Sequence, residues 1–230
     1  MTQVKKFIRS LTEYRSEAGV FNPWRQADPD YDLSCDAPKI RANQLEHYLR
    51  LRVPRARYIL VAEALGYQGG RFSGIAMTSE RILLGHHKQI NPAVVMPPDI
   101  VLRTSNQQCE HFSATQQKLG FNEPTATVVW TEIMENNLDP NDVILWNIFP
   151  FHPYKEGNLL SNRTPREPEK EEGLAYVRML RELCPAACLI AVGNHAEKTL
   201  QKYSIPAHKV PHPSMGGVTK FRQAFQNLIK

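Results

Sequence analysis

YILVAEALGYQGGRFSG, residues 58–74, is the stretch of the chain that decides its fold. It begins with a short apolar run rich in β-branched side chains, which is typical of a buried parallel strand. A glycine cluster follows at Gly66, Gly69, Gly70 and Gly74, and glycine lets backbone N–H groups approach a ligand closely. Open α/β sheets bind ligands at the carboxyl ends of their strands. The loop is therefore a candidate ligand site, although a merely tight connection would have the same pattern.

Three later apolar runs predict further strands, at residues 142–147, 188–193 and 207–210. Between and after these strands, apolar residues recur at helical spacing. The helices predicted in this way cover residues 124–137, 164–184 with a capping-box layout at its start, 196–203 and 219–229. Strands that alternate with helices predict an α/β fold of three layers, α/β/α, with a central four-stranded, mainly parallel sheet.

Residues 1–56 predict an N-terminal helical segment that packs on this core, with helices over 4–17 and 39–51 and a loop rich in proline and glycine between them. Residues 57–230 would form the α/β/α part, and we expect a single domain overall. Two later segments have a weaker pattern. Residues 86–121 are expected to be irregular, and the charged stretch that begins at Ser161 is expected to be mobile.

The composition narrows the class of protein. No stretch approaches the roughly 20 apolar residues of a membrane span, and the first residues lack the apolar core of a secretory signal. We therefore expect a cytoplasmic protein that does not bind membranes. The four cysteines are too few and too scattered for a disulfide framework or a zinc site, so we expect no metal and no cofactor. The net charge of +5 permits an anionic partner.

Three loops would meet at one edge of the predicted sheet, because the carboxyl ends of parallel strands lie together. They start at Glu63 after the first strand, at Asn147 after the second and at His212 after the last. Each of these residues has an ordinary alternative. Glu63 could be a solvated or salt-bridged carboxylate, Asn147 could close a strand end, and His212 could be a simple loop histidine. Their common edge nevertheless predicts one pocket built from separated segments.

These loops resemble the motifs of the uracil-DNA glycosylase superfamily. That superfamily has a water-activating or base-contacting loop after the first strand, an Asn at the end of the second and a His-Pro-Ser loop near the C-terminus. The corresponding residues here are Glu63-Ala64-Leu65-Gly66, Asn147 and His212-Pro213-Ser214, in the same order and with similar spacing. The resemblance implies a monomeric, cofactor-free DNA glycosylase of base excision repair, which hydrolyses the N-glycosidic bond of uracil or a related deaminated base.

The resemblance also implies roles for single residues. A base can be excised only after it has been turned out of the DNA stack, so the pocket must recognise a single base. The amide of Asn147 would contact the O4 and N3 edge of uracil, because an amide presents both an acceptor and donors. The imidazole of His212 would donate a hydrogen bond to O2, where negative charge develops in the transition state.

The first motif departs from the usual pattern of the family. Ala64 stands where the best-known branch has a water-activating Asp, so that catalytic group is missing from this chain. The nearest match is a branch whose motif reads Gly-Glu-Ala-Pro-Gly and which also lacks that Asp. Glu63 occupies the Glu position of that branch and is the candidate for holding water or stabilising the cationic sugar. Leu65 replaces the usual proline. Gly66 leaves open the place where a tyrosine excludes the methyl group of thymine.

The position that stacks on the base departs from the pattern as well. The family usually has a phenylalanine there, whereas this chain has Met77, with Phe72 as the alternative. A thioether packs against a ring but orients it less well than an aromatic face does. The Gly-Glu-Ala-Pro-Gly branch also carries a four-cysteine iron–sulfur cluster. The cysteines of this chain do not have the spacing of that cluster, so we expect none.

Several residues are expected to contact DNA around the extruded base. The family inserts a side chain into the DNA stack after its His-Pro-Ser motif, and Met215 is the only bulky candidate in this loop. Ser214 and Gly216 flank it, and Ser214 is also a candidate cap for the last helix. The candidates for phosphate contacts are Arg71, Lys209, Lys220 and Arg222.

Two alternatives stay open on the sequence alone. The missing Asp and the missing phenylalanine are also consistent with a DNA-binding relative that holds an unusual base without cleaving it. A nucleotide-binding hydrolase whose glycine loop cradles phosphate is less favoured. Its loop would need the lysine and serine that end a P-loop, or the glycine spacing of a dinucleotide site, and the chain has neither.

Overall fold

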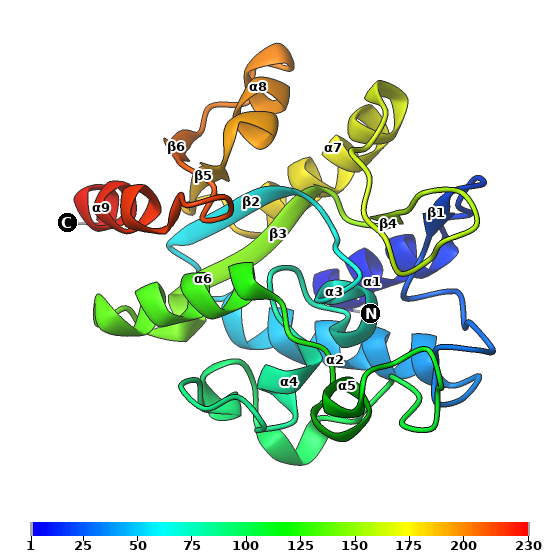
Figure 1. The fold of residues 1–230 in the computed structure, drawn as a ribbon. Coiled ribbons are helices and arrows are strands. Elements are labelled where there is room, and N and C mark those ends of the chain that lie inside the picture. The colour runs from blue at the N-terminus through cyan, green and yellow to red at the C-terminus, as the bar shows by residue number, and fades with distance from the viewer. Residues whose placement is uncertain (1, 230) are drawn as a thin grey trace.

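A parallel sheet forms the centre of the molecule in the computed structural model, which describes residues 2–229. The strand order is β3-β2-β5-β6, and every neighbouring pair is parallel (Figure 1). The strands are β2 (Tyr58–Ala64), β3 (Val143–Phe149), β5 (Cys188–Val192) and β6 (His208–Val210). The predicted fold class and the predicted four-stranded parallel sheet are therefore confirmed.

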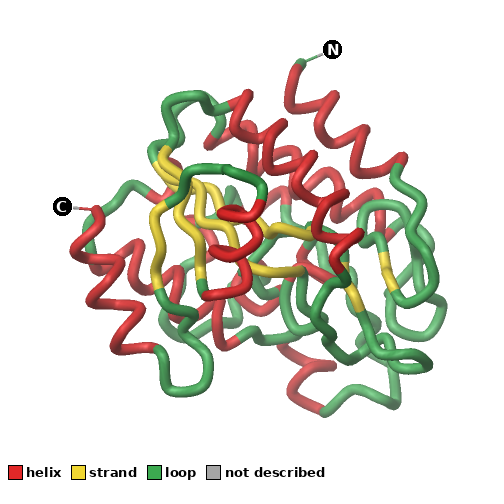
Figure 2. Tube along the Cα trace, turned by 90° about the horizontal axis from the view of Figure 1, so that it is seen from above, coloured by secondary structure: helices red, strands yellow, loops and turns green. Residues whose placement is uncertain are grey.

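Helices cover both faces of the sheet and complete the three layers (Figure 1, Figure 2). α7 and α8 lie on one face, whereas α2, α6 and α9 lie on the other. None of the helices within residues 2–229 is both long and apolar enough to cross a bilayer. The helices are α1 (Gln3–Glu13), α2 (Ala37–Arg52), α3 (Gly70–Ser73), α4 (Glu80–Leu83), α5 (Ala114–Leu119), α6 (Pro124–Glu135), α7 (Glu167–Leu183), α8 (Asn194–Lys202) and α9 (Val218–Ile229).

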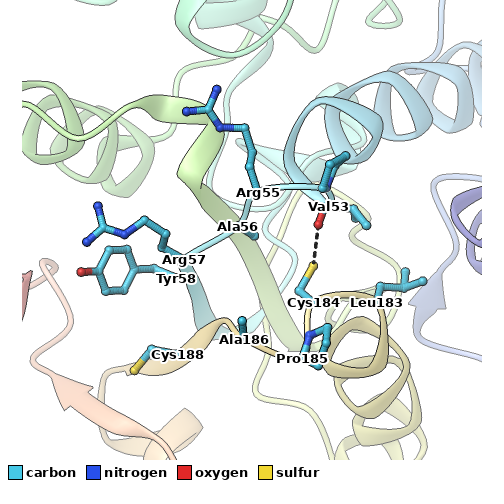
Figure 3. A pocket seen from close by; sticks show the side chains of 11 residues that line it. Val53, Arg55, Ala56, Arg57, Tyr58, Leu183, Cys184, Pro185, Ala186 and Cys188 are labelled. Carbon is cyan, nitrogen blue, oxygen red and sulfur yellow. Dashed lines mark hydrogen bonds between the residues drawn. The ribbon is translucent and has the colours of Figure 1, made fainter.

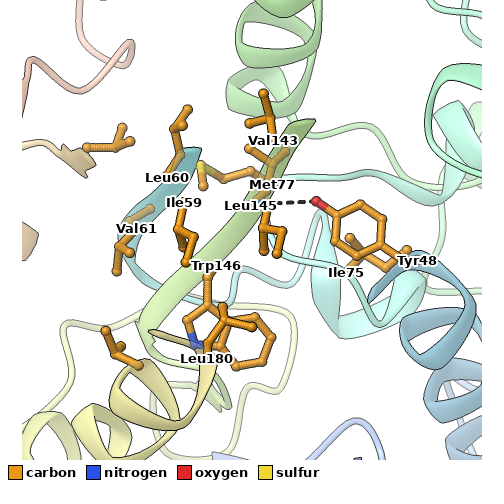
Figure 4. Packing of buried hydrophobic residues seen from close by; sticks show 14 of the residues in the cluster. Tyr48, Ile59, Leu60, Val61, Ile75, Met77, Val143, Leu145, Trp146 and Leu180 are labelled. Atoms are coloured by element: carbon orange, nitrogen blue, oxygen red, sulfur yellow. Dashed lines mark hydrogen bonds between the residues drawn. The ribbon is translucent and has the colours of Figure 1, made fainter. Parts of the chain in front are cut away.

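The neighbouring strands β2 and β3 bury side chains on both faces, because successive residues of a strand point to opposite sides. Figure 4 shows Leu145 of β3 beside Tyr48 of α2, and Trp146 beside Leu180 of α7. The Tyr48 hydroxyl accepts a hydrogen bond from the Leu145 N–H at 2.8 Å, which ties α2 to the sheet. This packing on both sides explains why the strands are near-continuous apolar runs in the sequence.

The N-terminal segment lies against the same core. α1 contacts α2 and α7, and the ring of Phe7 lies 5.3 Å from that of Trp146 of β3. α1 ends at Glu13, and not at residue 17 as predicted, because Tyr14 leaves the helical conformation and stacks on Phe151. A second, two-stranded antiparallel sheet joins β1 (Val20–Phe21) to β4 (His152–Pro153).

Three further details of the sequence prediction were wrong. β3 continues beyond Asn147, because its side chains up to Phe149 are all buried and favour a longer strand. The segment 86–121 includes the helix α5, which Ser113 caps. α7 has no cap at Thr164. The carboxylate of Glu169 instead accepts a hydrogen bond from the backbone N–H of Arg166 at 2.6 Å, so the helix begins after that residue.

A buried charge cluster anchors the far end of the loop that follows β2, and it corrects the prediction for Arg71. The Arg71 side chain has no exposed area and pairs with Asp32. Asp32 also forms a bidentate pair with Arg41, at 2.9 and 3.1 Å. The rings of Phe21 and Phe72 lie 4.4 and 4.2 Å from the guanidinium carbon of Arg71. A guanidinium enclosed in this way cannot contact a DNA phosphate, so that prediction was wrong.

Candidate functional site

Two cavities lie at opposite ends of the sheet, and only one has unpaired polar atoms. The larger, of about 740 Å³, lies at the amino ends of β2 and β5. Figure 3 shows its walls, where the thiol of Cys184 donates a weak hydrogen bond to the Val53 carbonyl at 3.7 Å. Within residues 2–229, none of its side chains has a buried polar atom without a partner. This cavity therefore shows no sign of a ligand site.

The smaller cavity, of about 330 Å³, lies at the carboxyl ends of the strands, where α/β sheets bind ligands. It contains three buried oxygens without a hydrogen-bond partner, one each on Glu63, Glu123 and Asn147. Because buried polar groups are ordinarily paired, unpaired acceptors around a cavity indicate a ligand site. We call this cavity the recess. Its lining residues are Ala62, Glu63, Ala64, Leu65, Gly66, Met77, Glu123, Thr125, Asn147, Asn162, Arg163, Thr164 and His212.

β3 presents the amide of Asn147 to the recess. Asn147 pairs in register with Ala62 of β2, and neighbours in register point to the same face of a sheet. The small side chain of Ala62 leaves space beside the amide. Asn147 is only 2 % exposed, yet its Oδ1 atom has no partner. The residue is thus a buried amide that faces a cavity with its acceptor free.

His212 is held in one orientation after β6. A Cβ atom on Gly193 would lie 2.9 Å from the Cβ of His212, so a larger residue there would push the ring away. The backbone N–H of Ser214 donates to Nδ1 at 3.1 Å, and the Ser214 hydroxyl lies 2.7 Å from the same atom. Ser214 therefore positions His212 and does not cap α9, which begins at Val218.

The hydrogen bonds of His212 also determine its tautomer. Since Nδ1 accepts a hydrogen bond, the proton of the neutral ring is on Nε2. Burial lowers the pKa of His212, and the neighbouring His195 lowers it further. The ring is therefore neutral at pH 7, and its Nε2–H makes no hydrogen bond to residues 2–229. It is available to a ligand.

Glu63 lies at the end of β2 next to a histidine that the sequence analysis did not identify. Its Oε1 atom is 3.3 Å from Nδ1 of His195, in the first turn of α8. Burial raises the pKa of Glu63, while the electrostatic interactions with His195 and Lys170 offset part of the rise. A signal for His195 existed in the sequence, because the residue follows the predicted strand at 188–193 by two positions and so lies at the same edge of the sheet. Gly193, which separates β5 from α8, has a positive φ of 89°.

Glu123 is a second residue that the sequence analysis missed. It directly precedes α6, at the N-cap position, and its side chain makes no capping bond. The carboxyl group lies over Gly69 instead, where a Cβ atom would come within 1.9 Å of Oε2. Burial raises the pKa of Glu123 to about 7. No local pattern could have indicated this, because the burial comes from the glycine loop after β2.

The segment before α7 closes one side of the recess and was also missed. Asn162 and Arg163 belong to the stretch expected to be mobile, yet both have fixed partners. The Asn162 side-chain oxygen accepts the Tyr67 N–H at 3.0 Å. Arg163 forms a bidentate pair with Glu169, at 2.6 and 2.7 Å. These bonds connect the segment to the first loop and to α7, so it forms a stable wall.

Most of the predicted base-contacting residues lie in the recess. Ala64, Gly66 and Met77 line it together with Asn147. A Cβ atom on Gly66 would lie 3.7 Å from the amide atoms of Asn162, so this amide borders the space that Gly66 leaves open. Met77 is buried and has a left-handed backbone, with φ of 45°.

Phe72 does not lie in the recess, and the prediction of a stacking role for it was wrong. Its side chain is fully buried in a separate cluster with Cys109, Phe112 and Phe121. Its ring stacks on that of Phe121 at 4.3 Å. The ring of Phe121 and the guanidinium of Arg71 cover the two faces of the Phe72 ring, so no face is left for a base.

The His-Pro-Ser loop stands out from the surface beside the recess. Met215 is fully exposed and is the most exposed large apolar side chain within residues 2–229. Its φ of 52° lies in the left-handed region, which an ordinary residue adopts only under constraint. Ser214, Gly216 and Lys220 are exposed around it. The loop thus presents one apolar tip on a polar turn.

Two of the predicted phosphate contacts have protein partners. Lys209 pairs with Glu197 at 2.5 Å, and Arg222 pairs with the buried Glu132 at 2.8 Å. Lys220 makes no ion pair with residues 2–229. Of the basic residues predicted for phosphate binding, Lys220 is therefore the one whose charge is not already compensated.

The cysteines do not form a ligand set. Cys35 is exposed, Cys109 lies in the aromatic cluster, and Cys184 and Cys188 flank the turn between α7 and β5. Within residues 2–229, no three or more His, Cys, Asp and Glu side chains are grouped so as to hold a metal ion. The residues present therefore do not fit the iron–sulfur cluster of the Gly-Glu-Ala-Pro-Gly branch.

The fold is uracil-DNA glycosylase-like. Among solved structures, the chain is similar to wild-type SMUG2 of Pedobacter heparinus, with a TM-score of 0.64 and 14% sequence identity over 100% of this chain and 99% of that chain. At this identity the likeness shows the fold alone. No protein-family model and no curated protein matches the chain.

Proposed function

We propose that the protein is a DNA glycosylase that hydrolyses the N-glycosidic bond of uracil, or of a related deaminated base, after the base has left the DNA stack. The observation that carries the proposal is one recess with two complementary groups, the unpaired amide of Asn147 and the free Nε2–H of His212. Together they match a base edge with carbonyl oxygens and an imide N–H. The fold shared with SMUG2 supports the same class.

In the proposed reaction, His212 stabilises the departing base. As the bond between the sugar C1′ and the base N1 breaks, its electron pair leaves with the base and the sugar becomes cationic. The Nε2–H of His212 donates to O2 of the base, where negative charge develops only as the bond breaks. Ser214 holds Nδ1, so the ring is oriented before the substrate arrives.

Glu63 compensates for the missing polar group at Ala64. Its carboxylate stabilises the cationic sugar and accepts a proton from the water whose oxygen bonds to C1′. The products are the free base and an abasic site. His195, 3.3 Å from the Glu63 carboxylate, keeps that group at the mouth of the recess.

The exposed His-Pro-Ser loop is suited to contact the DNA around the extruded base. Met215 enters the base stack and fills the gap that the extruded base leaves, as apolar wedges do in DNA-bending proteins. Lys220 contacts a nearby phosphate, which positions the DNA without reading its sequence. Every group in this scheme comes from one chain, so the proposed reaction requires no second copy of the protein.

The proposal is tested with oligonucleotides that carry one uracil, single-stranded and double-stranded, by scoring strand breaks after alkali treatment. Asn147→Ala is expected to lower the rate of base release about 10- to 100-fold, because the base then loses its edge contacts. Asn227→Ala, which removes an exposed amide on α9, is the control and should keep the full rate. A wild-type protein that binds uracil-containing DNA but never releases the base would favour the non-cleaving alternative.

Glu63→Gln tests the carboxylate. The amide neither accepts a proton nor stabilises positive charge, so we expect about a 10²-fold loss of base release. The matched control is Glu171→Gln, an exposed carboxylate of α7 with no ion pair in residues 2–229. Full activity of Glu63→Gln would remove Glu63 from the chemistry and assign the water to backbone groups.

A further inference from the structure

The carboxyl group of Glu123 is a polar group of the recess that the scheme above does not use. It makes no hydrogen bond to residues 2–229, and its Oε2 atom is buried over Gly69. The residue lines the recess together with Asn147. A carboxyl group of this kind has a large desolvation cost unless a ligand supplies its partner.

We propose that Glu123 is a second base-contacting residue, whose protonated carboxyl group donates a hydrogen bond to the exocyclic carbonyl oxygen of the base. That oxygen is O4 of uracil or O6 of a deaminated purine. The inference rests on the proposed function, since it requires an extruded base in the recess. It adds a residue that determines which bases are accepted.

The chemistry of the base edge explains the need for a second donor. A carbonyl oxygen has two lone pairs, and the amide of Asn147 can donate to one of them. A protonated carboxyl group beside it can donate to the other. An ionised carboxylate is only an acceptor, so it would repel the carbonyl oxygen and would instead favour the amino group of an undamaged cytosine or adenine.

The surroundings of Glu123 favour the protonated form near neutral pH. Burial alone accounts for the rise of its pKa to about 7. Its proton is therefore present below pH 7 and is lost above it. The charged or titratable groups on the segments around it include Glu63, Tyr67, Arg81, His87, Arg163 and His212. Arg163 is neutralised by Glu169, and Arg81 donates to the Gly120 carbonyl.

Two substitutions separate a donor from a structural role. Glu123→Gln keeps the shape of the side chain and donates at every pH, whereas Glu123→Ala cannot donate. We would measure the single-turnover rate of uracil release between pH 6.5 and 8.5. The wild-type rate should fall by about tenfold over this range, as the proton is lost. Glu123→Gln should retain most of the rate and lose this pH dependence. Glu123→Ala should be slow, with no such dependence.

Glu135→Gln is the control, because it removes an exposed carboxylate from the same helix and should keep the wild-type profile. Titration of Glu63 and His212 is common to all variants, so it cancels in the comparison. A Gln variant as slow as the Ala variant, or one with an unchanged pH profile, would overturn the role of Glu123 while leaving the glycosylase proposal intact. If the wild-type protein neither released the base nor preferred DNA that contains uracil, the role of Glu123 and the glycosylase proposal would both be overturned.

Discussion

His212→Ala is expected to lower the rate of uracil release by about 10²- to 10³-fold, which corresponds to about 2.7 to 4 kcal/mol of transition-state stabilisation. The loss follows from the position of its Nε2–H, the one donor in the scheme that meets charge developing on O2. Single-turnover release from a uracil oligonucleotide measures the effect directly. Substrate binding should change far less, since the interaction strengthens mainly as the bond breaks.

The nature of the leaving group provides a sharper version of this test. In 5-fluorouracil the fluorine withdraws electrons, so the departing anion needs less help from the protein. His212→Ala should therefore slow the release of 5-fluorouracil less than that of uracil. His208→Ala removes an exposed histidine of β6 and should leave both rates unchanged. Equal losses for the two bases would contradict a role for His212 in stabilising the leaving group.

Asp32→Asn is expected to lower the free energy of unfolding by about 3 to 5 kcal/mol, the usual cost of removing one partner from a buried ion pair. Asp32 is the carboxylate partner of two fully buried guanidinium groups, those of Arg41 and Arg71. Two nitrogens of Arg71 already lack partners, and burial lowers its pKa to about 10. Urea denaturation measures the loss.

The pH dependence of this effect has a definite sign. Burial alone would raise the pKa of Asp32, but the charges of Arg71 and Arg41 hold it below the ordinary value. The stabilisation is therefore fully present above the unfolded pKa of about 3.9 and is lost as the pH falls through the folded pKa. The difference between wild type and Asp32→Asn should be largest near neutral pH and should shrink in acid.

Two variants complete the stability experiment. Asp30→Asn removes a nearby exposed carboxylate and should change the stability by less than about 0.5 kcal/mol. Arg71→Met, added to Asp32→Asn, should recover part of the loss because it removes an unpaired buried charge. If Asp32→Asn were as stable as Asp30→Asn, the cluster would not anchor the loop. Because Arg71 belongs to the loop that lines the recess, we also expect Asp32→Asn to slow base release.

The positions of the strands in the sequence were predictable, because each strand is an apolar run that can be recognised from its own residues. The apolar run at Tyr58 contains its own evidence for a strand buried on both faces, and the runs that end in Asn147 and before His212 do the same. Parallel topology then places their carboxyl ends at one edge. That rule alone was enough to predict that Asn147 and His212 line one cavity. The same rule placed Glu63 there, and motif resemblance added Gly66 and Met77.

The wrong and missing site residues have a common cause, because their surroundings are formed by segments that are distant in the sequence. Arg71 looked like a surface cation until Asp32, 39 residues earlier, was seen to enclose it. Glu123 directly precedes the predicted helix over 124–137 and drew no functional prediction, because only the glycine loop after β2 buries its carboxyl group. His195 was given no role, because its position next to Glu63 of another element is set by the fold.

The sequence by itself determined the class of fold, the edge of the sheet that carries the site, and the amide and imidazole at that edge. Periodicity and motif order depend on a residue and its near neighbours. The parallel direction of the strands then places their carboxyl ends at one edge of the sheet. Only the tertiary structure decided which charged groups are buried, which are paired and which face the recess. The physical reason is that burial and pKa depend on atoms that folding brings from remote segments, and no local pattern encodes them.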